Sequence, residues 1–132
     1  MPHFMLDTNI LSEAIRNPKG PASDRMRALA DEICTSIIVA AELRFGVAKG
    51  GRRRLANRVE ELLRTLEVVA FDAPSDVAYG EVRAQLERAG ETIGPNDMLI
   101  AAHALSLGLV LVTDNEREFT RVRGLTLENW LR

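Results

Sequence analysis

Short apolar runs separated by longer amphipathic stretches predict a sheet whose strands are connected by helices. Runs of four or five β-compatible residues have the length of buried strands. The predicted strands span residues 3–6, 33–36, 67–71 and 109–112, with a last strand near residues 125–127. The run at residues 109–112, with the sequence Leu-Val-Leu-Val, is the clearest of them.

Residues that cap and terminate helices set the limits of the predicted helices. The run Asp7-Thr8-Asn9 is typical of a helix start, and the segment from Asn17 to Pro21 ends that helix. Pro95 is typical of a first helical position, and Gly108 of the residue after a helix. Further helices are predicted over residues 22–32, from Ser36 to about Val47, over residues 52–66, 74–89 and 95–107, and as a short turn at residues 116–119.

The alternation of strands and helices determines the predicted fold class. Strands joined through helices require crossover connections, which produce a mainly parallel sheet covered on both faces. We therefore predict an α/β fold with a mainly parallel central sheet flanked by helices, formed as one domain by residues 1–132. In such sheets ligands bind beyond the carboxyl ends of the strands, so functional residues are expected there.

Composition narrows the class of protein. With 46% hydrophobic and 27% charged residues, the chain has enough apolar side chains to form a core. Its one cysteine, Cys34, has no intrachain partner, which excludes a disulfide scaffold. No apolar run is long enough to span a membrane, and no signal peptide is visible. A soluble cytoplasmic protein is therefore expected.

Basic residues are concentrated in one segment of a chain whose formal net charge is −2. Residues 49–64 carry six Lys or Arg and two Glu, a net charge of +4, whereas the rest of the chain after them has six basic and eleven acidic residues. This basic stripe includes Arg52, Arg53, Arg54 and Arg58. It is compatible with binding a phosphate backbone, and equally with a solvated helix face.

Four acidic residues stand out by position. Asp7 and Asp114 follow two of the predicted strands, Glu42 lies among apolar helical neighbours, and Asp97 lies in the first turn of an apolar helix. Each position also has a purely structural explanation. These are a helix N-cap for Asp7, a buried ion pair with an arginine for Glu42, the helix dipole for Asp97 and a turn for Asp114.

Together, these four acids predict a metal site at one edge of the sheet. Carboxylates in one cleft repel each other unless a cation lies between them, and oxygen ligands without Cys or His are typical of Mg²⁺ or Mn²⁺. Such sites usually serve phosphate chemistry. No nucleotide-binding glycine loop is present. His103, on an apolar helix, is interpreted as structural, and Cys34 as a small core residue.

Four separated motifs occur in a fixed order along the chain. They are Met5-Leu6-Asp7-Thr8-Asn9-Ile10, Cys34-Thr35-Ser36-Ile37 through Ala41-Glu42-Leu43-Arg44-Phe45-Gly46, Ile93-Gly94-Pro95-Asn96-Asp97 through Ala104, and Leu111-Val112-Thr113-Asp114-Asn115 followed by Glu118-Phe119. In this order they resemble the PIN-domain ribonucleases of the VapC toxin type, nearly from end to end. The resemblance implies a three-layer α/β/α domain and a Mg²⁺- or Mn²⁺-dependent endoribonuclease toxin, held inactive by a VapB-type antitoxin.

The resemblance also assigns roles to the acidic residues. Asp7, Glu42 and Asp97 match three acidic positions of the family. The fourth role is shared between Asp114 and Asn115, because many relatives place an Asp or Asn two residues after the matching threonine. Asp7 and Asp97 are expected as direct metal ligands, with Glu42 and Asp114 or Asn115 completing the site. The threonines Thr8 and Thr113 are expected to orient the carboxylates.

The same resemblance implies a substrate and a protein partner. RNA is expected to be cut by metal-activated water, with a transfer RNA cut in its anticodon loop as the leading substrate and ribosomal and messenger RNA left open. The four arginines of the basic stripe are candidates for phosphate contacts. The C-terminal part of an antitoxin is expected to pack near Leu11, Ile15 and Phe45, and the toxin to form a two-fold homodimer.

Two other functions remain open from the sequence. A non-catalytic regulatory binding module can share this fold, because fold does not determine function. A metal-dependent phosphatase of small molecules would also use clustered carboxylates, but it gives no reason for the basic stripe.

Overall fold

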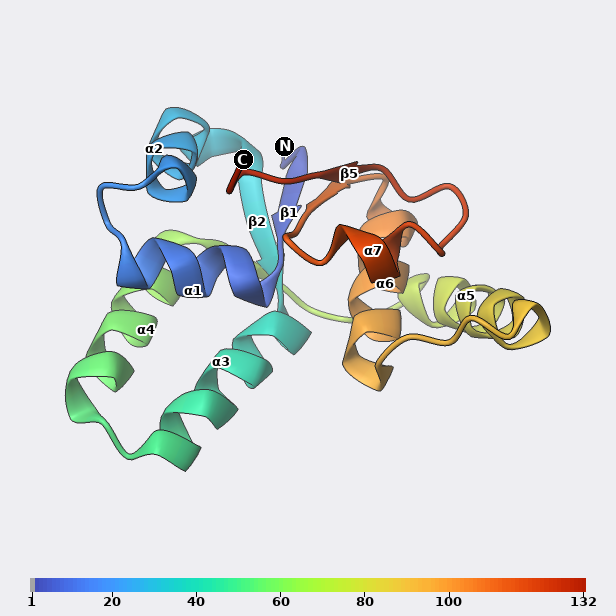
Figure 1. The fold of residues 1–132 in the computed structure, drawn as a ribbon, viewed down its shortest axis with the longest axis horizontal. Coiled ribbons are helices and arrows are strands. Elements are labelled where there is room, and N and C mark those ends of the chain that lie inside the picture. Colours follow the sequence, from blue (N-terminus) through green and yellow to red (C-terminus); the bar gives the residue numbers. More distant parts are fainter. Residues whose placement is uncertain (1) are drawn as a thin grey trace.

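The computed structural model describes residues 2–132 and is built around a five-stranded sheet in which all neighbouring strands are parallel (Figure 1). The strand order is β3-β2-β1-β4-β5. The strands are β1 Phe4–Leu6, β2 Ile33–Ser36, β3 Glu67–Val69, β4 Val110–Val112 and β5 Leu127–Glu128. The helices are α1 Thr8–Arg16, α2 Pro21–Ala28, α3 Ile37–Gly50, α4 Arg53–Thr65, α5 Ser75–Ala89, α6 Pro95–Leu107 and α7 Glu116–Phe119, with a 3-10 turn at Ala30–Glu32.

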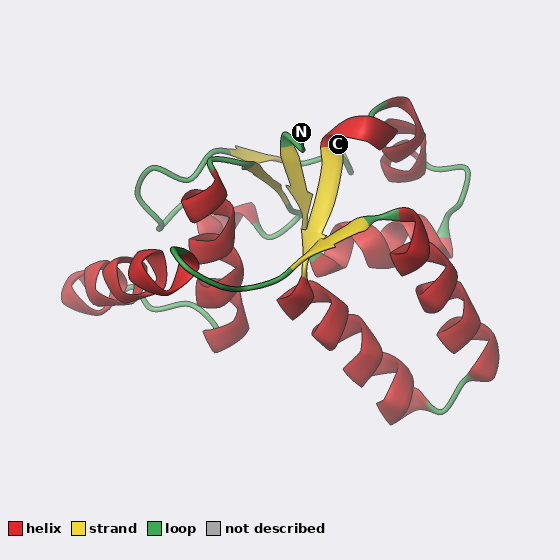
Figure 2. Cartoon of the chain, turned by 180° about the vertical axis from the view of Figure 1, so that it is seen from behind, coloured by secondary structure: helices red, strands yellow, loops and turns green. Residues whose placement is uncertain are grey.

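Helices cover the sheet on both faces, which confirms the predicted α/β class. Helices α1, α2 and α4 lie on one side and α5 and α6 on the other, with the strands between them (Figures 1 and 2). Helix α3 contacts α1 and α4, and its first part also contacts α6. No helix in residues 2–132 is long and apolar enough to cross a membrane.

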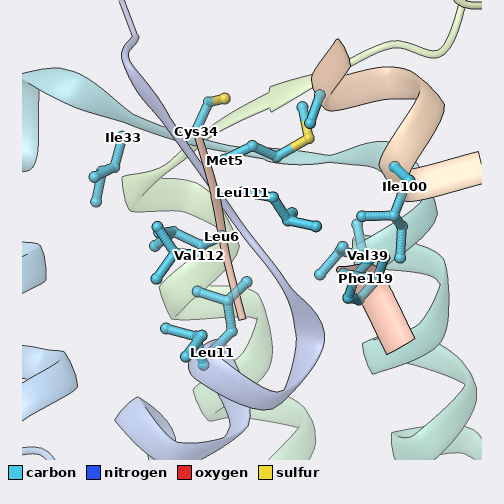
Figure 3. Close-up of a cluster of buried hydrophobic side chains, with 14 of the residues drawn as sticks. Met5, Leu6, Leu11, Ile33, Cys34, Val39, Ile100, Leu111, Val112 and Phe119 are labelled. Carbon is cyan, nitrogen blue, oxygen red and sulfur yellow. The ribbon is translucent and has the colours of Figure 1, made fainter. Parts of the chain in front are cut away.

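The core lies where the two central strands pack against the helices. Met5 and Leu6 of β1 and Leu111 and Val112 of β4 are completely buried. Figure 3 shows them packed with side chains from β2, α1, α3, α6 and α7. Cys34 is also buried within β2, as predicted for a small core residue. A tightly packed scaffold of this kind fixes the positions of the residues that follow each strand.

Several predicted elements differ from the structure at their ends. Residues 22–32 do not form one helix: α2 ends at Ala28, and a separate 3-10 turn leads into β2. The last strand lies at Leu127–Glu128 rather than at 125–127, because its pairing places Leu127 opposite Leu111. Helix α3 continues past Val47 to Gly50, and Gly51 then ends it with a positive φ of 66°.

The parallel register brings three chain segments to one edge of the sheet. Leu6 at the end of β1 is paired with Thr35 of β2 on one side and with Val112 of β4 on the other. The residues that follow these strands therefore start at the same level. They lead into α1, α3 and the turn before α7, which surround the candidate site.

Candidate active site

Asp7 is the most deeply placed carboxylate at this edge. It follows β1 directly and is the N-cap of α1, with only 4% of its surface exposed. Its Oδ1 accepts a hydrogen bond from the backbone N–H of Thr8 at 2.8 Å, and its Oδ2 accepts one from Oγ1 of Thr113 at 2.8 Å. Burial is the largest effect on its pKa and raises it, while these hydrogen bonds act in the opposite direction.

Glu42 projects from the second turn of α3 and is held by two polar side chains. Its Oε1 accepts a hydrogen bond from Oγ1 of Thr8 at 2.5 Å, and its Oε2 accepts one from Nδ2 of Asn96 at 3.3 Å. The alternative of a buried ion pair with an arginine is wrong: Arg44, two residues later, pairs with Glu60 instead. Thr8 thus contacts both Asp7 and Glu42, as expected of a residue that orients carboxylates.

Asp97 lies in the first turn of α6. Among residues 2–132, no side chain or backbone N–H donates a hydrogen bond to its carboxylate. Gly94, the N-cap of α6, leaves room for it, because a Cβ at Gly94 would lie 3.3 Å from Oδ2 of Asp97. The pKa of Asp97 is raised to about 6, first by burial and then by the charges of Asp7, Glu42 and Glu118. The side chain is therefore a carboxylate that faces other carboxylates and lacks a protein partner.

Glu118 is a member of this acidic group that the sequence pattern alone does not assign. It lies in α7, directly before the buried Phe119, and its charge raises the pKa of Asp97. In the sequence, Glu118-Phe119 stands out only as part of the family resemblance. Its place in the group depends on the burial of Phe119, which anchors this short helix and is a property of the folded structure.

Asp114 and Asn115 lie in the turn between β4 and α7. Oδ1 of Asp114 accepts a hydrogen bond from Nδ2 of Asn129 at 2.9 Å, and Asp114 is not among the charges that raise the pKa of Asp7 or Asp97. Asn115 is the N-cap of α7, and its backbone N–H donates to Oγ1 of Thr113. Both residues shape the turn after β4, and the fourth role shared between Asp114 and Asn115 stays a prediction.

The acidic group has the donor chemistry of a Mg²⁺ or Mn²⁺ site. All of its donors are carboxylate oxygens, and their mutual repulsion would be relieved by a cation. Within residues 2–132, no group of three or more His, Cys, Asp or Glu side chains is positioned to enclose a metal ion.

The basic stripe divides into two parts in the structure. Arg52, Arg53 and Arg54 are exposed at the turn between α3 and α4, at one end of the molecule (Figure 1). Positive charges at the start of a helix are unfavourable for its dipole, so helix stability does not explain this run. Arg58 lies apart, and its Nη1 donates to the backbone carbonyl of Ile15 at 3.4 Å.

An apolar groove of about 500 Å³ lies between α1, α2 and α4. Its lining includes Ile15, Met26 and Leu62, with Arg58 among the charged groups beside them. The three residues that were expected to bind the partner differ in their exposure. Ile15 lines the groove and Phe45 is 67% exposed on α3, but Leu11 is completely buried in the core. The expectation that Leu11 contacts the partner is wrong, because its side chain is inaccessible in this fold.

Comparison with known sequences places this arrangement among related proteins. The family model described as PIN domain matches residues 4–125. The chain is 40% identical to the tRNA(fMet)-specific endonuclease VapC of Shigella flexneri over 129 residues, which cover 96% of this chain and 97% of that protein. It is 41% identical to ribonuclease VapC2 of Rickettsia felis over 130 residues, with 96% and 97% covered.

A solved structure extends the similarity to three dimensions. The DNA-bound VapBC from Salmonella typhimurium contains a chain with a TM-score of 0.92 and 38% sequence identity to this one. The match covers 98% of this chain and 99% of the other. The similarity therefore includes all of the segments that carry the acidic group, the arginine run and the apolar groove.

Proposed function

This chain belongs to the PIN-domain family, and on that premise we propose that it is a metal-dependent endoribonuclease, the toxin of a VapBC-type toxin–antitoxin pair. The observation that carries the proposal is the meeting of Asp7, Glu42, Asp97 and Glu118 at the carboxyl edge of a parallel sheet. The four carboxylates come from separate chain segments, and their mutual repulsion destabilises the fold. A folded protein keeps such a group when it binds a cation and does chemistry there.

Asp7 and Asp97 are the residues that would hold Mg²⁺ or Mn²⁺ directly. Oδ1 and Oδ2 of Asp7 are fixed by Thr8 and Thr113, and Asp97 has no competing donor. Glu42 is fixed by its two hydrogen bonds close to them, where it can hold water. When bound, the metal neutralises charge on the scissile phosphate and lowers the pKa of water.

The chain's own residues supply orientation. Thr8 donates to both Asp7 and Glu42, so that one residue sets the relative position of two carboxylates. Asn96 holds the far oxygen of Glu42 from the start of α6. Each of these donors restricts a carboxylate to one geometry before substrate arrives, and this lowers the cost of ordering the site during the reaction.

A transfer RNA is the substrate that we propose. The relative from Shigella flexneri is named as a tRNA(fMet)-specific endonuclease and is 40% identical to this chain. The three exposed arginines at residues 52–54 provide positive charge for a phosphate backbone at the end of the α3–α4 hairpin. Such contacts position RNA without reading its sequence, so the bond that is cut must be selected elsewhere in the complex.

A VapB-type antitoxin is the proposed partner, and the apolar groove is its proposed binding surface. Solved relatives are VapBC complexes. The groove between α1, α2 and α4 offers apolar area for an antitoxin's C-terminal segment, and Phe45 of α3 is a separate exposed apolar side chain that such a segment can cover. We further propose that residues 1–132 work as one domain, that the toxin forms a homodimer within a larger complex, and that it acts in the cytoplasm.

One experiment separates this function from its two alternatives. The purified chain is incubated with total transfer RNA and, in parallel, with a generic phosphomonoester, each with Mg²⁺ and with EDTA. The proposal expects Mg²⁺-dependent RNA fragments and no release of phosphate from the monoester. Phosphate release without RNA cleavage would favour the phosphatase, and the absence of both reactions would favour a non-catalytic binding module.

A further inference from the structure

Two side-chain hydrogen bonds join the start of α3 to α6 in the described residues. At the solvent side, Nδ2 of Asn96 donates to Oε2 of Glu42 at 3.3 Å. In the interior, Oγ of Ser36 and Nδ1 of His103 are 2.8 Å apart, and both residues are completely buried. The inner bond lies outside the acidic group, and nothing in the proposed chemistry uses it directly.

Ser36 has a second bond that is compatible with donation from its hydroxyl to the histidine ring. It is the N-cap of α3, and its Oγ accepts a hydrogen bond from the backbone N–H of Ile38 at 3.0 Å. That bond uses one of the two lone pairs of Oγ and leaves the hydroxyl hydrogen free to donate to Nδ1 of His103. If the hydroxyl donates in this way, His103 is a neutral ring with its hydrogen on Nε2.

The surroundings of the ring favour this neutral state. Burial lowers the pKa of His103, and the Ala70 carbonyl and the Asp72 charge oppose this only in part. The ring of Phe71 packs at 5.2 Å from it, edge to face. Nε2 has no hydrogen-bond partner of normal geometry in residues 2–132. A histidine kept here at the cost of an unpaired nitrogen contributes something that an apolar residue of similar size would not.

The positions of the two bonds along the helices show what that contribution is. Glu42 lies six residues after Ser36, and Asp97 lies six residues before His103. With a rise of about 1.5 Å per residue, each carboxylate is about 9 Å along its helix from the buried bond. The inner bond therefore joins the two helices at one point, and Glu42 and Asp97, whose charges interact, lie the same number of residues away from it.

We infer that His103 is a positioning residue, which accepts a hydrogen bond from Ser36 and thereby sets the angle between α3 and α6 that brings Glu42 and Asp97 together. The inference rests on the proposed function, because it concerns the same acidic group. It differs from a packing role, since the required property is the acceptor at the Nδ1 position rather than the volume of the ring.

Two substitutions of His103 separate these properties. His103→Leu keeps apolar volume and removes the acceptor, whereas His103→Asn loses volume and places an amide oxygen close to the Nδ1 position. Both variants, as full-length purified chains, are assayed well below their melting temperatures for kcat and KM on transfer RNA. Binding of Mn²⁺ alone is measured by titration calorimetry.

A positioning role predicts that the two substitutions have different effects on kcat and on Mn²⁺ binding, and a packing role does not predict this difference. His103→Leu should lower kcat by about 10- to 100-fold with little change in KM, because small misplacements of reacting groups have effects of this size. It should also weaken Mn²⁺ binding, while His103→Asn stays close to the wild type in both. Equal losses in the two variants, or wild-type kcat and Mn²⁺ affinity in His103→Leu, would overturn the inference.

A double-mutant cycle keeps the test decisive if His103→Asn does not fold. Ser36→Ala removes the donor, and the variant with both Ser36→Ala and His103→Leu should bind Mn²⁺ no more weakly than the worse single variant. Independent, multiplying losses would contradict a shared bond. If the wild type binds Mn²⁺ but cleaves no RNA, the proposed function fails, and the Mn²⁺ titrations still decide the role of His103.

Discussion

Replacing Asp97 with Asn tests whether repulsion within the acidic group destabilises the metal-free fold. Burial and the charges of Asp7, Glu42 and Glu118 raise the pKa of Asp97 from 3.8 to about 6. A rise of this size corresponds to about 3 kcal/mol against the ionised form, and solvent screening of a half-buried group reduces it to about 1–2 kcal/mol. Asp97→Asn should therefore raise Tm at pH 7.5 by roughly 3–8 °C.

The pH dependence of this effect has a defined sign. Because the pKa of Asp97 is higher in the folded state than in the unfolded chain, the folded state binds the proton more tightly between about pH 6 and pH 3.8. The contribution of this group to stability is thus least favourable above pH 6, and it improves as the pH falls. The Tm difference between Asp97→Asn and the wild type should shrink to about half when the pH is lowered from about 7.5 to about 5.

Thermal unfolding in EDTA, followed by circular dichroism at both pH values, measures this directly. Asp114→Asn is the matched control, because the carboxylate of Asp114 is engaged by Asn129 and is not among the charges that raise the pKa of Asp97. That control should not gain stability. A melting temperature of Asp97→Asn at or below the wild-type value at pH 7.5, or a difference that does not change with pH, would refute the reasoning.

Three further predictions concern the acidic group, the arginines and the groove. Glu118→Gln should lower kcat for RNA cleavage by at least about 10-fold, because it removes one of the charges around Asp97, and Asp114→Asn should have a much smaller effect in the same assay. Replacing the three arginines at residues 52–54 with Ala should make the slope of log affinity for RNA against log salt concentration less steep by about 0.7 for each phosphate that the protein no longer neutralises. The affinity for Mn²⁺ should stay unchanged. An unaltered slope would show that the arginine run is only a solvated helix face. Leu62→Lys should abolish antitoxin binding in a pull-down while RNA cleavage continues, because it places a charge in the apolar groove, and unchanged binding would remove the groove as the antitoxin site.

The elements with strong local signals were predicted well from the sequence. Pro95 at the start and Gly108 at the end define α6, and both residues take these roles in the structure. The strand at Val110–Val112 is central and buried, so its apolar run is continuous. The break after Ala28 had no such signal, because no Gly or Pro marks it, and it is set by the way Leu29 packs before the chain enters β2.

The acidic group was predictable only as far as chain topology determines it. Asp7 and Asp97 follow directly from their places at a strand end and a helix start, and the structure brings their charges together. Asp114 also follows a strand, but its side chain accepts a hydrogen bond from Asn129, which lies 15 residues later in the chain and outside the motif. Glu118 joins the group because Phe119 is buried under α7, which is a tertiary effect.

The most direct test of the metal-dependent nuclease is a time course of transfer RNA cleavage by the wild type and by Asp7→Asn at equal protein concentration. Each is assayed with Mg²⁺ and with EDTA, and the RNA ends are sequenced. The wild type should produce discrete fragments with Mg²⁺ only, and Asp7→Asn should produce none, although its fold is retained because the loss of one carboxylate relieves repulsion. Cleavage by the wild type in EDTA, or cleavage at the wild-type rate by Asp7→Asn, would contradict a metal site built on Asp7.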